Sequence, residues 1–169
     1  CEMGTDISSV AIDKNGKPID GGKWSDGKSA DPKYGSSYSE GEPFGWRNYA
    51  VYGFIADVRN YSQVTPIASY RGLPDDFDGY DEFGYCTLGE HGHNWLSVSE
   101  LLAFDYDAIM EDRRYAGRNE YGGISGNLTS DIGKGEFMTY REFLGSSFFH
   151  DLAELQRIGA DRVVFGFNT

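Results

Sequence analysis

The spacing of apolar residues changes several times along the chain, and its first third predicts a hairpin followed by a loop. Residues 7–12 and 17–19 are rich in β-branched side chains and flank the pair Asn15-Gly16. Asn-Gly readily adopts the positive φ angles of a type I′ turn, so we expect a hairpin here. Residues 20–45 consist mostly of Gly, Ser, Asp and Lys without a hydrophobic period, which predicts a long exposed or mobile loop.

Two stretches in the middle of the chain have the pattern of helices. From Trp46 to Val58, apolar residues recur at steps of three and four, as in an amphipathic helix with one buried face. Ser97 followed by Glu100 is a capping box, in which side-chain oxygens accept hydrogen bonds from free backbone N–H groups. The residues after it predict a helix over about 98–109.

The C-terminal part of the chain predicts another helix and a buried strand. Thr139 and Glu142 repeat the capping box. The helix that they begin should break near Gly145 and end at Gly159, a residue suited to the left-handed conformation after a helix. Residues 162–167 form a short apolar run between polar residues, which is typical of a buried strand.

The remaining segments contain too many glycines or prolines for long regular elements. Residues 61–94 are expected to form a long loop, and residues 118–137 a hairpin or a flap. The order of these elements predicts an α+β fold, in which a small, mostly antiparallel sheet packs against two or three helices with long Gly-rich loops. A mass of 18.8 kDa fits a single domain over residues 1–169.

Composition and charge exclude several classes of partner. No apolar run approaches the roughly 20 residues of a membrane-spanning helix, so we expect no contact with a membrane interior. A net charge of −12 and a pI near 4.5 repel polyanions, which disfavours broad nucleic-acid binding. The two cysteines, Cys1 and Cys86, cannot form the dense disulfide framework of a small secreted domain, so we expect a cytoplasmic protein.

Two arginine-containing segments are candidate sites for an anion. Arg59 and Arg71 flank the start of the predicted loop and can bind a phosphate or carboxylate through paired N–H donors. Aromatic side chains in the same stretch can stack on a base. The alternative is an internal Asp–Arg network that fixes the loop to the helix before it, and both can hold together. The candidate ligand-binding residues are Arg59, Arg71, Asp57, Asn60, Tyr85, His91 and Trp95.

The two histidines of the motif His91-Gly92-His93 are candidate metal ligands. On an extended loop, alternate side chains can converge on one divalent metal, and a carboxylate such as that of Asp76 could complete the site. The alternative is that one imidazole packs beside the following helix while the other is solvated. Cys86 is interpreted as a small packing residue, with a nucleophile beside a histidine as its alternative.

Several short motifs are spread along the chain. They are Arg47-Asn48-Tyr49, Ala56-Asp57-Val58-Arg59-Asn60, Arg71-Gly72-Leu73-Pro74-Asp75-Asp76, His91-Gly92-His93 with Trp95-Leu96, Glu100-Leu101-Leu102 and Arg162-Val163-Val164-Phe165. Together these motifs resemble a family of small proteins encoded by phages and bacteria. The similarity covers residues 46–105 and the C-terminal strand, while residues 20–45 depart from it in composition. The resemblance assigns no chemistry to particular residues. It implies a phage protein that acts against host defence, and some proteins of that kind capture nucleotide signals in pockets formed by oligomers.

Three functions remain after these exclusions. The first is a binding protein, in which Arg59 and Arg71 hold the phosphate of a small anionic ligand, most plausibly a nucleotide signal, without transforming it. The second is a phosphodiesterase, in which His91 and His93 bind a divalent metal that activates water. The third is an acidic protein that inhibits a protein partner by mimicking DNA. A homo-oligomer with a pocket shared between subunits is compatible with the first.

Overall fold

The computed structural model describes residues 4–19, 42–80, 82–83, 86–118 and 124–169, and its fold is α+β, as the sequence predicts. These residues divide into two compact units. The expectation of a single domain stays a prediction. The first unit comprises the described residues of Cys1–Arg47, Ala68–Phe104 and Ser146–Thr169, and the second comprises those of Asn48–Ile67 and Asp105–Gly145.

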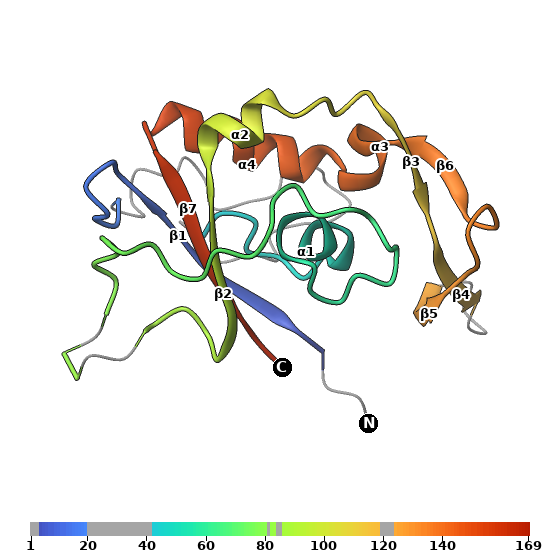
Figure 1. The fold of residues 1–169 in the computed structure, drawn as a ribbon, viewed down its shortest axis with the longest axis horizontal. Helices are drawn as coiled ribbons and strands as arrows, with labels where there is room; N and C mark the ends of the chain where they lie inside the picture. Colours follow the sequence, from blue (N-terminus) through green and yellow to red (C-terminus); the bar gives the residue numbers. More distant parts are fainter. Residues whose placement is uncertain (1–3, 20–41, 81, 84–85, 119–123) are drawn as a thin grey trace. The chain divides into compact units, whose positions relative to one another are not determined.

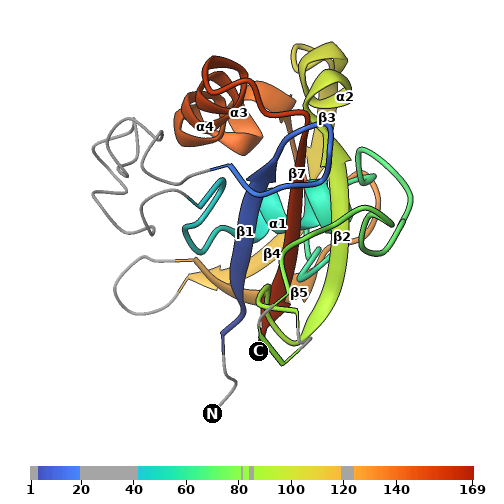
Figure 2. The ribbon, with the colours of Figure 1, turned by 90° about the vertical axis from the view of Figure 1, so that its left-hand side faces the viewer.

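The first unit contains a three-stranded antiparallel sheet. Strand β7 (Arg162–Asn168) lies between β1 (Asp6–Ile12) and β2 (His91–Ser97), as Figures 1 and 2 show. Residues 163–167 of β7 are all buried. A strand that is covered on both faces needs apolar residues without alternation, so the buried strand predicted over residues 162–167 is confirmed.

Two helices of the first unit pack beside each other. Helix α2 (Val98–Ala103) begins directly after β2 and contacts α4 (Ser146–Arg157) (Figure 1). The predicted start of α2 is confirmed, because Ser97 Oγ accepts the backbone N–H of Glu100 at 3.1 Å. Its predicted end near Ile109 is wrong, because the helix ends at Ala103.

An aromatic cluster forms part of the core of the first unit. The ring of Phe44 stacks on that of Phe148 with centroids 4.9 Å apart, and it meets Trp46 edge to face. All three side chains are buried. The prediction of an exposed loop over residues 20–45 is therefore wrong at Pro43 and Phe44, while residues 20–41 lie outside the described residues.

The second unit combines two short helices with two pairs of antiparallel strands. Tyr106 and Tyr140 both contact the ring of Phe54, with centroids 6.0 and 5.8 Å away, and build an aromatic core. The predicted break near Gly145 is confirmed, because the helix before it ends there with a Gly145 φ of 84°. The elements are α1 (Tyr49–Ala56), β3 (Ile109–Asp112) paired with β6 (Glu136–Thr139), β4 (Arg114–Arg118) paired with β5 (Ile124–Thr129), and α3 (Tyr140–Leu144).

Helix α1 lies within the predicted range 46–58 but has no polar face. Residues 50–55 are all buried, so the pattern of an amphipathic helix is wrong for this segment. Asn48 begins the helix by accepting the N–H of Ala50 at 3.0 Å. Asp57 ends it in the left-handed conformation, with φ 56°. A hairpin of β4 and β5 overlaps the range 118–137 that was expected to form a hairpin or a flap, but it begins earlier, because β4 covers Arg114–Arg118.

The chain reverses at Asn15-Gly16 as predicted, but not through a type I′ turn. That turn needs a positive φ at both central residues, whereas Gly16 has a φ of 79° and Asn15 is not in the left-handed region. The Asp13 carboxylate instead accepts the N–H groups of Asn15 and Lys17 at 2.8 and 3.0 Å. This Asx-type arrangement stabilises the turn locally.

Within the part of the chain that the structure describes, no helix combines the length and the apolar character that a membrane span requires. The cytoplasmic location stays a prediction.

Candidate functional site

The indole of Trp95 lies on the same face of the sheet as Arg162. In β2, Asn94 and Leu96 are buried while Trp95 between them points to the opposite face. Trp95 pairs with Val164 and Ser97 pairs with Arg162, so Arg162 is the diagonal neighbour of Trp95 across the strands. The guanidinium carbon of Arg162 lies 5.7 Å from the centroid of the Trp95 ring.

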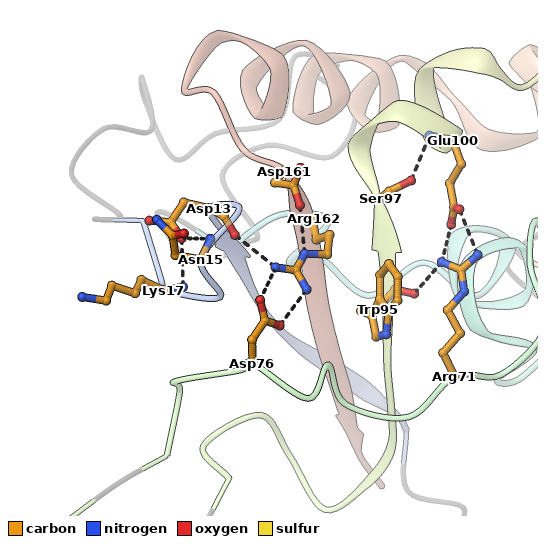
Figure 3. Close-up of polar contacts among 10 residues, drawn as sticks. All are labelled: Asp13, Asn15, Lys17, Arg71, Asp76, Trp95, Ser97, Glu100, Asp161 and Arg162. Carbon is orange, nitrogen blue, oxygen red and sulfur yellow. Dashed lines mark hydrogen bonds and ion pairs between the residues drawn. The ribbon is translucent and has the colours of Figure 1, made fainter.

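Arg71 approaches the same ring from an irregular segment. Its backbone N–H donates to Asn94 Oδ1 at 2.9 Å, which fixes the segment beside β2. Its guanidinium carbon lies 4.5 Å from the centroid of the Trp95 ring, a cation–π contact. The same group donates to the Glu100 carboxylate at 2.7 and 2.9 Å and to the Trp95 carbonyl at 3.3 Å (Figure 3).

The ion pair of Arg71 and Glu100 changes the predicted capping box. In a complete box, the Glu100 carboxylate would accept the backbone N–H of Ser97. Here both of its oxygens accept from Arg71, and only the Ser97 half of the box is formed. Glu100 therefore connects helix α2 to the segment that carries Arg71.

Arg162 is held by a second group of oxygens. It donates to both oxygens of Asp76 at 2.8 Å, to Asp161 Oδ2 at 2.9 Å and to the Asp13 carbonyl at 3.3 Å (Figure 3). The hydrogen bonds that Arg162 donates to Asp76 hold the pKa of Asp76 below its ordinary value and raise the pKa of Arg162. Both groups are therefore charged at neutral pH.

These side chains line a cleft of about 400 Å³, within the range of roughly 300 to 1,000 Å³ typical of small-molecule sites. Figure 3 shows the Trp95 ring between the two guanidinium groups. We refer to it as the Trp95 cleft. Its lining residues are Arg71, Leu73, Pro74, Asp75, Asp76, Trp95 and Arg162.

A larger hollow of about 550 Å³ lies between α2 and the end of α4. Its lining is mostly small or apolar, including Val98, Leu102 and Ala160, and Asp161 is its one charged residue. A binding site combines apolar walls with several converging polar groups. The smaller Trp95 cleft meets this description better, so we assign the candidate site there.

The structure brings some of the predicted ligand-binding residues together and leaves others elsewhere. Arg71 and Trp95 are in contact in the first unit. Arg59 belongs to the second unit, where it donates to the Tyr61 hydroxyl at 2.9 Å and lies 5.7 Å from the Tyr49 ring centroid. The shared grip of one anion by Arg59 and Arg71 stays a prediction, and Tyr85 lies outside the described residues.

Asp57 and Asn60 form a local network at the end of α1. The Asn60 amide donates to Asp57 Oδ1 at 2.8 Å and to the Val64 carbonyl at 2.7 Å, and its oxygen accepts the Val64 N–H at 3.1 Å. The Cβ that an alanine would add at Gly53 would lie 2.6 Å from the Asn60 side-chain oxygen, so the network packs closely on the helix. These contacts fix residues 60–64 to the preceding helix through Asp57 and Asn60, and they include none of the arginines of the Asp–Arg network considered above.

The two candidate metal-ligating histidines lie on strand β2 rather than on a loop, so that part of the prediction is wrong. His91 Nε2 lies 2.7 Å from Thr169 Oγ1, and His93 Nε2 lies 3.0 Å from the Gly89 carbonyl oxygen. Asp76, the third candidate, binds Arg162. Among the described residues, no three His, Cys, Asp or Glu side chains lie close enough together to hold a metal ion.

Cys86 is partly buried and packs against an apolar cluster that includes Phe77, Leu88 and Val164. This agrees with its interpretation as a packing residue. The residue that the sequence analysis missed in the Trp95 cleft is Arg162, which was expected only as the first residue of a buried strand. An arginine at the start of an otherwise apolar strand was a usable signal for a functional residue, but the sequence did not show that this strand pairs with the one that carries Trp95.

Comparisons of the chain with protein-family models, with curated proteins and with solved structures find no match.

Proposed function

We propose that the protein binds a small anionic ligand with a planar ring, namely a nucleotide, in the Trp95 cleft. The observation that carries the proposal is the position of two guanidinium groups, those of Arg71 and Arg162, within 4.5 and 5.7 Å of one indole ring in one cleft. Guanidinium groups bind phosphate through paired donors and also stack on flat rings. An aromatic base can extend such a stack.

The carboxylate that pairs with Arg71 is an exchangeable partner in this proposal. The side chains of Arg71 and Glu100 are 27% and 29% exposed, so water can replace either partner. Exposed ion pairs of this kind contribute about 0 to 1 kcal/mol, because solvent screens them. A hydrogen bond to a charged group contributes about 1.5 to 3 kcal/mol. A phosphate that offers Arg71 two oxygens can therefore replace the Glu100 carboxylate.

The ion pairs also hold the two arginines ready for a ligand. Arg71 is oriented by two carboxylate oxygens of Glu100 and by the Trp95 carbonyl. Arg162 is oriented by three carboxylate oxygens, two of Asp76 and one of Asp161, and by the Asp13 carbonyl. Immobilising a flexible side chain on binding costs about 0.5 to 1.5 kcal/mol. Because the two arginines are already ordered, a ligand that binds them avoids most of this cost.

The proposal is tested by depletion of nucleotides from solution. Purified protein is incubated with nucleoside mono- and diphosphates and cyclic dinucleotides, and the free compounds are quantified before and after heat denaturation. We expect one compound to disappear and to return intact. Arg71→Ala should abolish this depletion and shift Tm by little, because the Arg71–Glu100 pair is partly exposed.

Arg157→Ala is the matched control. Arg157 also donates to a carboxylate, that of Glu154, and its side chain is 51% exposed, but it does not line the cleft. This variant should deplete the compound as the wild type does. Failure to deplete any compound, or equal depletion by Arg71→Ala, would refute the proposal. Return of the compound in cleaved form would refute binding without transformation.

A further inference from the structure

One carboxylate of the Trp95 cleft, that of Asp75, has no hydrogen-bond or ion-pair partner among the described side chains and backbone groups. Both oxygens of Asp76 accept from Arg162, and those of Glu100 accept from Arg71. Asp75 also lines the cleft, and among the described residues it has no hydrogen bond or ion pair of its side chain. The cleft thus offers a ligand two flat cationic groups, one aromatic ring and one unpaired acceptor.

This combination disfavours a purely cationic ligand. Asp75 alone would attract an ammonium group, and the face of an indole would also bind one. The Trp95 ring, however, already has two guanidinium groups within 4.5 and 5.7 Å of its centroid, which would repel a further cation. A ligand that uses the whole cleft therefore carries an anionic group for the arginines and neutral N–H donors for Asp75.

The two oxygens of a carboxylate are best matched by two adjacent N–H donors. Among the common bases, guanine presents such a pair, from its N1–H and its exocyclic 2-amino group. Adenine and cytosine present one amino group beside a ring nitrogen that accepts, and uracil presents a single N–H between two carbonyls. Those acceptor atoms would face the negative charge of the carboxylate, which is unfavourable.

We propose that the ligand of the Trp95 cleft is a guanine nucleotide, in which Asp75 accepts hydrogen bonds from the N1–H and 2-amino groups of the base. This inference rests on the proposed function of the cleft. Arg71 and Arg162 bind the phosphates, and Asp75 determines which base is accepted. Because Asp75 is exposed and unpaired, its replacement should not disturb the fold.

The test compares GDP, ADP and inosine diphosphate by titration calorimetry with the full chain. Inosine diphosphate has the N1–H of guanine but lacks the 2-amino group. We expect GDP to bind at least about tenfold more tightly than ADP, with inosine diphosphate between them, because hydrogen bonds to a charged group are stronger than those between neutral groups. Asp75→Asn should remove this preference.

Asp78→Asn is the matched control, because Asp78 is a nearby exposed aspartate that does not line the cleft. It should retain the preference for GDP, and thermal unfolding should show that both variants fold. If ADP binds as tightly as GDP in an Arg71-dependent manner, or if Asp75→Asn keeps the wild-type preference, the inference about guanine is wrong and the proposed function stands. If none of the three compounds or the wider nucleotide panel binds, both are wrong.

Discussion

Replacement of Asp151 by Asn should remove a large part of the pH dependence of stability. Asp151 lies on α4 with no exposed surface. One of its oxygens accepts the backbone N–H of Phe44 at 2.8 Å, and the other lies 3.0 Å from His150 Nδ1. Burial outweighs these contacts and, with a smaller contribution from the nearby Glu154 carboxylate, raises the pKa of Asp151 from 3.8 to about 6.

The sign and size of the effect follow from this pKa. Because the native state holds the proton up to about pH 6 and the unfolded state releases it near pH 4, the native state binds more protons between these values. The contribution to stability is therefore complete below about pH 4 and is lost as the pH rises through about 6. A shift of about two pKa units at about 1.4 kcal/mol each gives a loss of about 3 kcal/mol.

The assay is urea unfolding of the wild type and of Asp151→Asn at several pH values from 4 to 8. Asn keeps the oxygen that accepts the Phe44 N–H but cannot ionise. The difference between the two proteins cancels the titration of the groups that do not interact with Asp151, including the general effect of the net charge of −12. Relative to the variant, the wild type should lose about 3 kcal/mol between pH 4 and pH 7. A difference that stays constant, or that grows in favour of the wild type as the pH rises, would refute the reasoning. As a second measurement, the carboxyl carbon resonance of Asp151 in the wild type reports the same pKa without a variant.

Two further substitutions test the cleft and the sheet. Glu100→Gln should raise the affinity for the nucleotide severalfold in the same titration, because it removes a negative charge that competes for Arg71; weaker binding would contradict the exchange of partners. Gly166→Ala should lower the free energy of unfolding by about 1 to 3 kcal/mol or more in urea, because the new Cβ would overlap the Leu88 carbonyl oxygen and crowd the His93 ring. A change below about 0.5 kcal/mol would show that this close approach is unimportant.

The starts of two helices were predictable because local contacts determine them. Ser97 and Thr139 accept the N–H groups of Glu100 and Glu142, both at 3.1 Å, and each pair lies three residues apart in the sequence. The end of α2 was not predictable in this way. The carbonyls of Tyr106 and Ala108 accept the N–H groups of Arg141 and Tyr140, and Ile109 pairs with Thr139 of β6. These contacts with a segment far along the chain override the helical pattern before Ile109.

The distinction between local contacts and contacts distant in sequence also separates the predictable part of the Trp95 cleft from the rest. Arg71 and Trp95 were chosen together because they lie in one stretch rich in aromatic residues. Arg162 reaches the same ring through the register of β2 on β7, which pairs Trp95 with Val164. A one-residue shift of that register would turn Trp95 to the other face of the sheet, so the apolar run that Arg162 opens could not by itself show which aromatic ring this arginine reaches.

The sign of the Glu100→Gln effect depends on two opposing contributions of Glu100. Its carboxylate orients Arg71, and the loss of this restraint costs a ligand about 0.5 to 1.5 kcal/mol in side-chain ordering. It also repels an incoming phosphate, by about 1 to 4 kcal/mol for unit charges about 4 Å apart near a protein surface. Arg71 keeps its hydrogen bond to the Trp95 carbonyl and its contact with the indole ring in the variant, which reduces the first contribution. Relief of repulsion therefore exceeds the loss of orientation, and the variant should bind the nucleotide more tightly than the wild type.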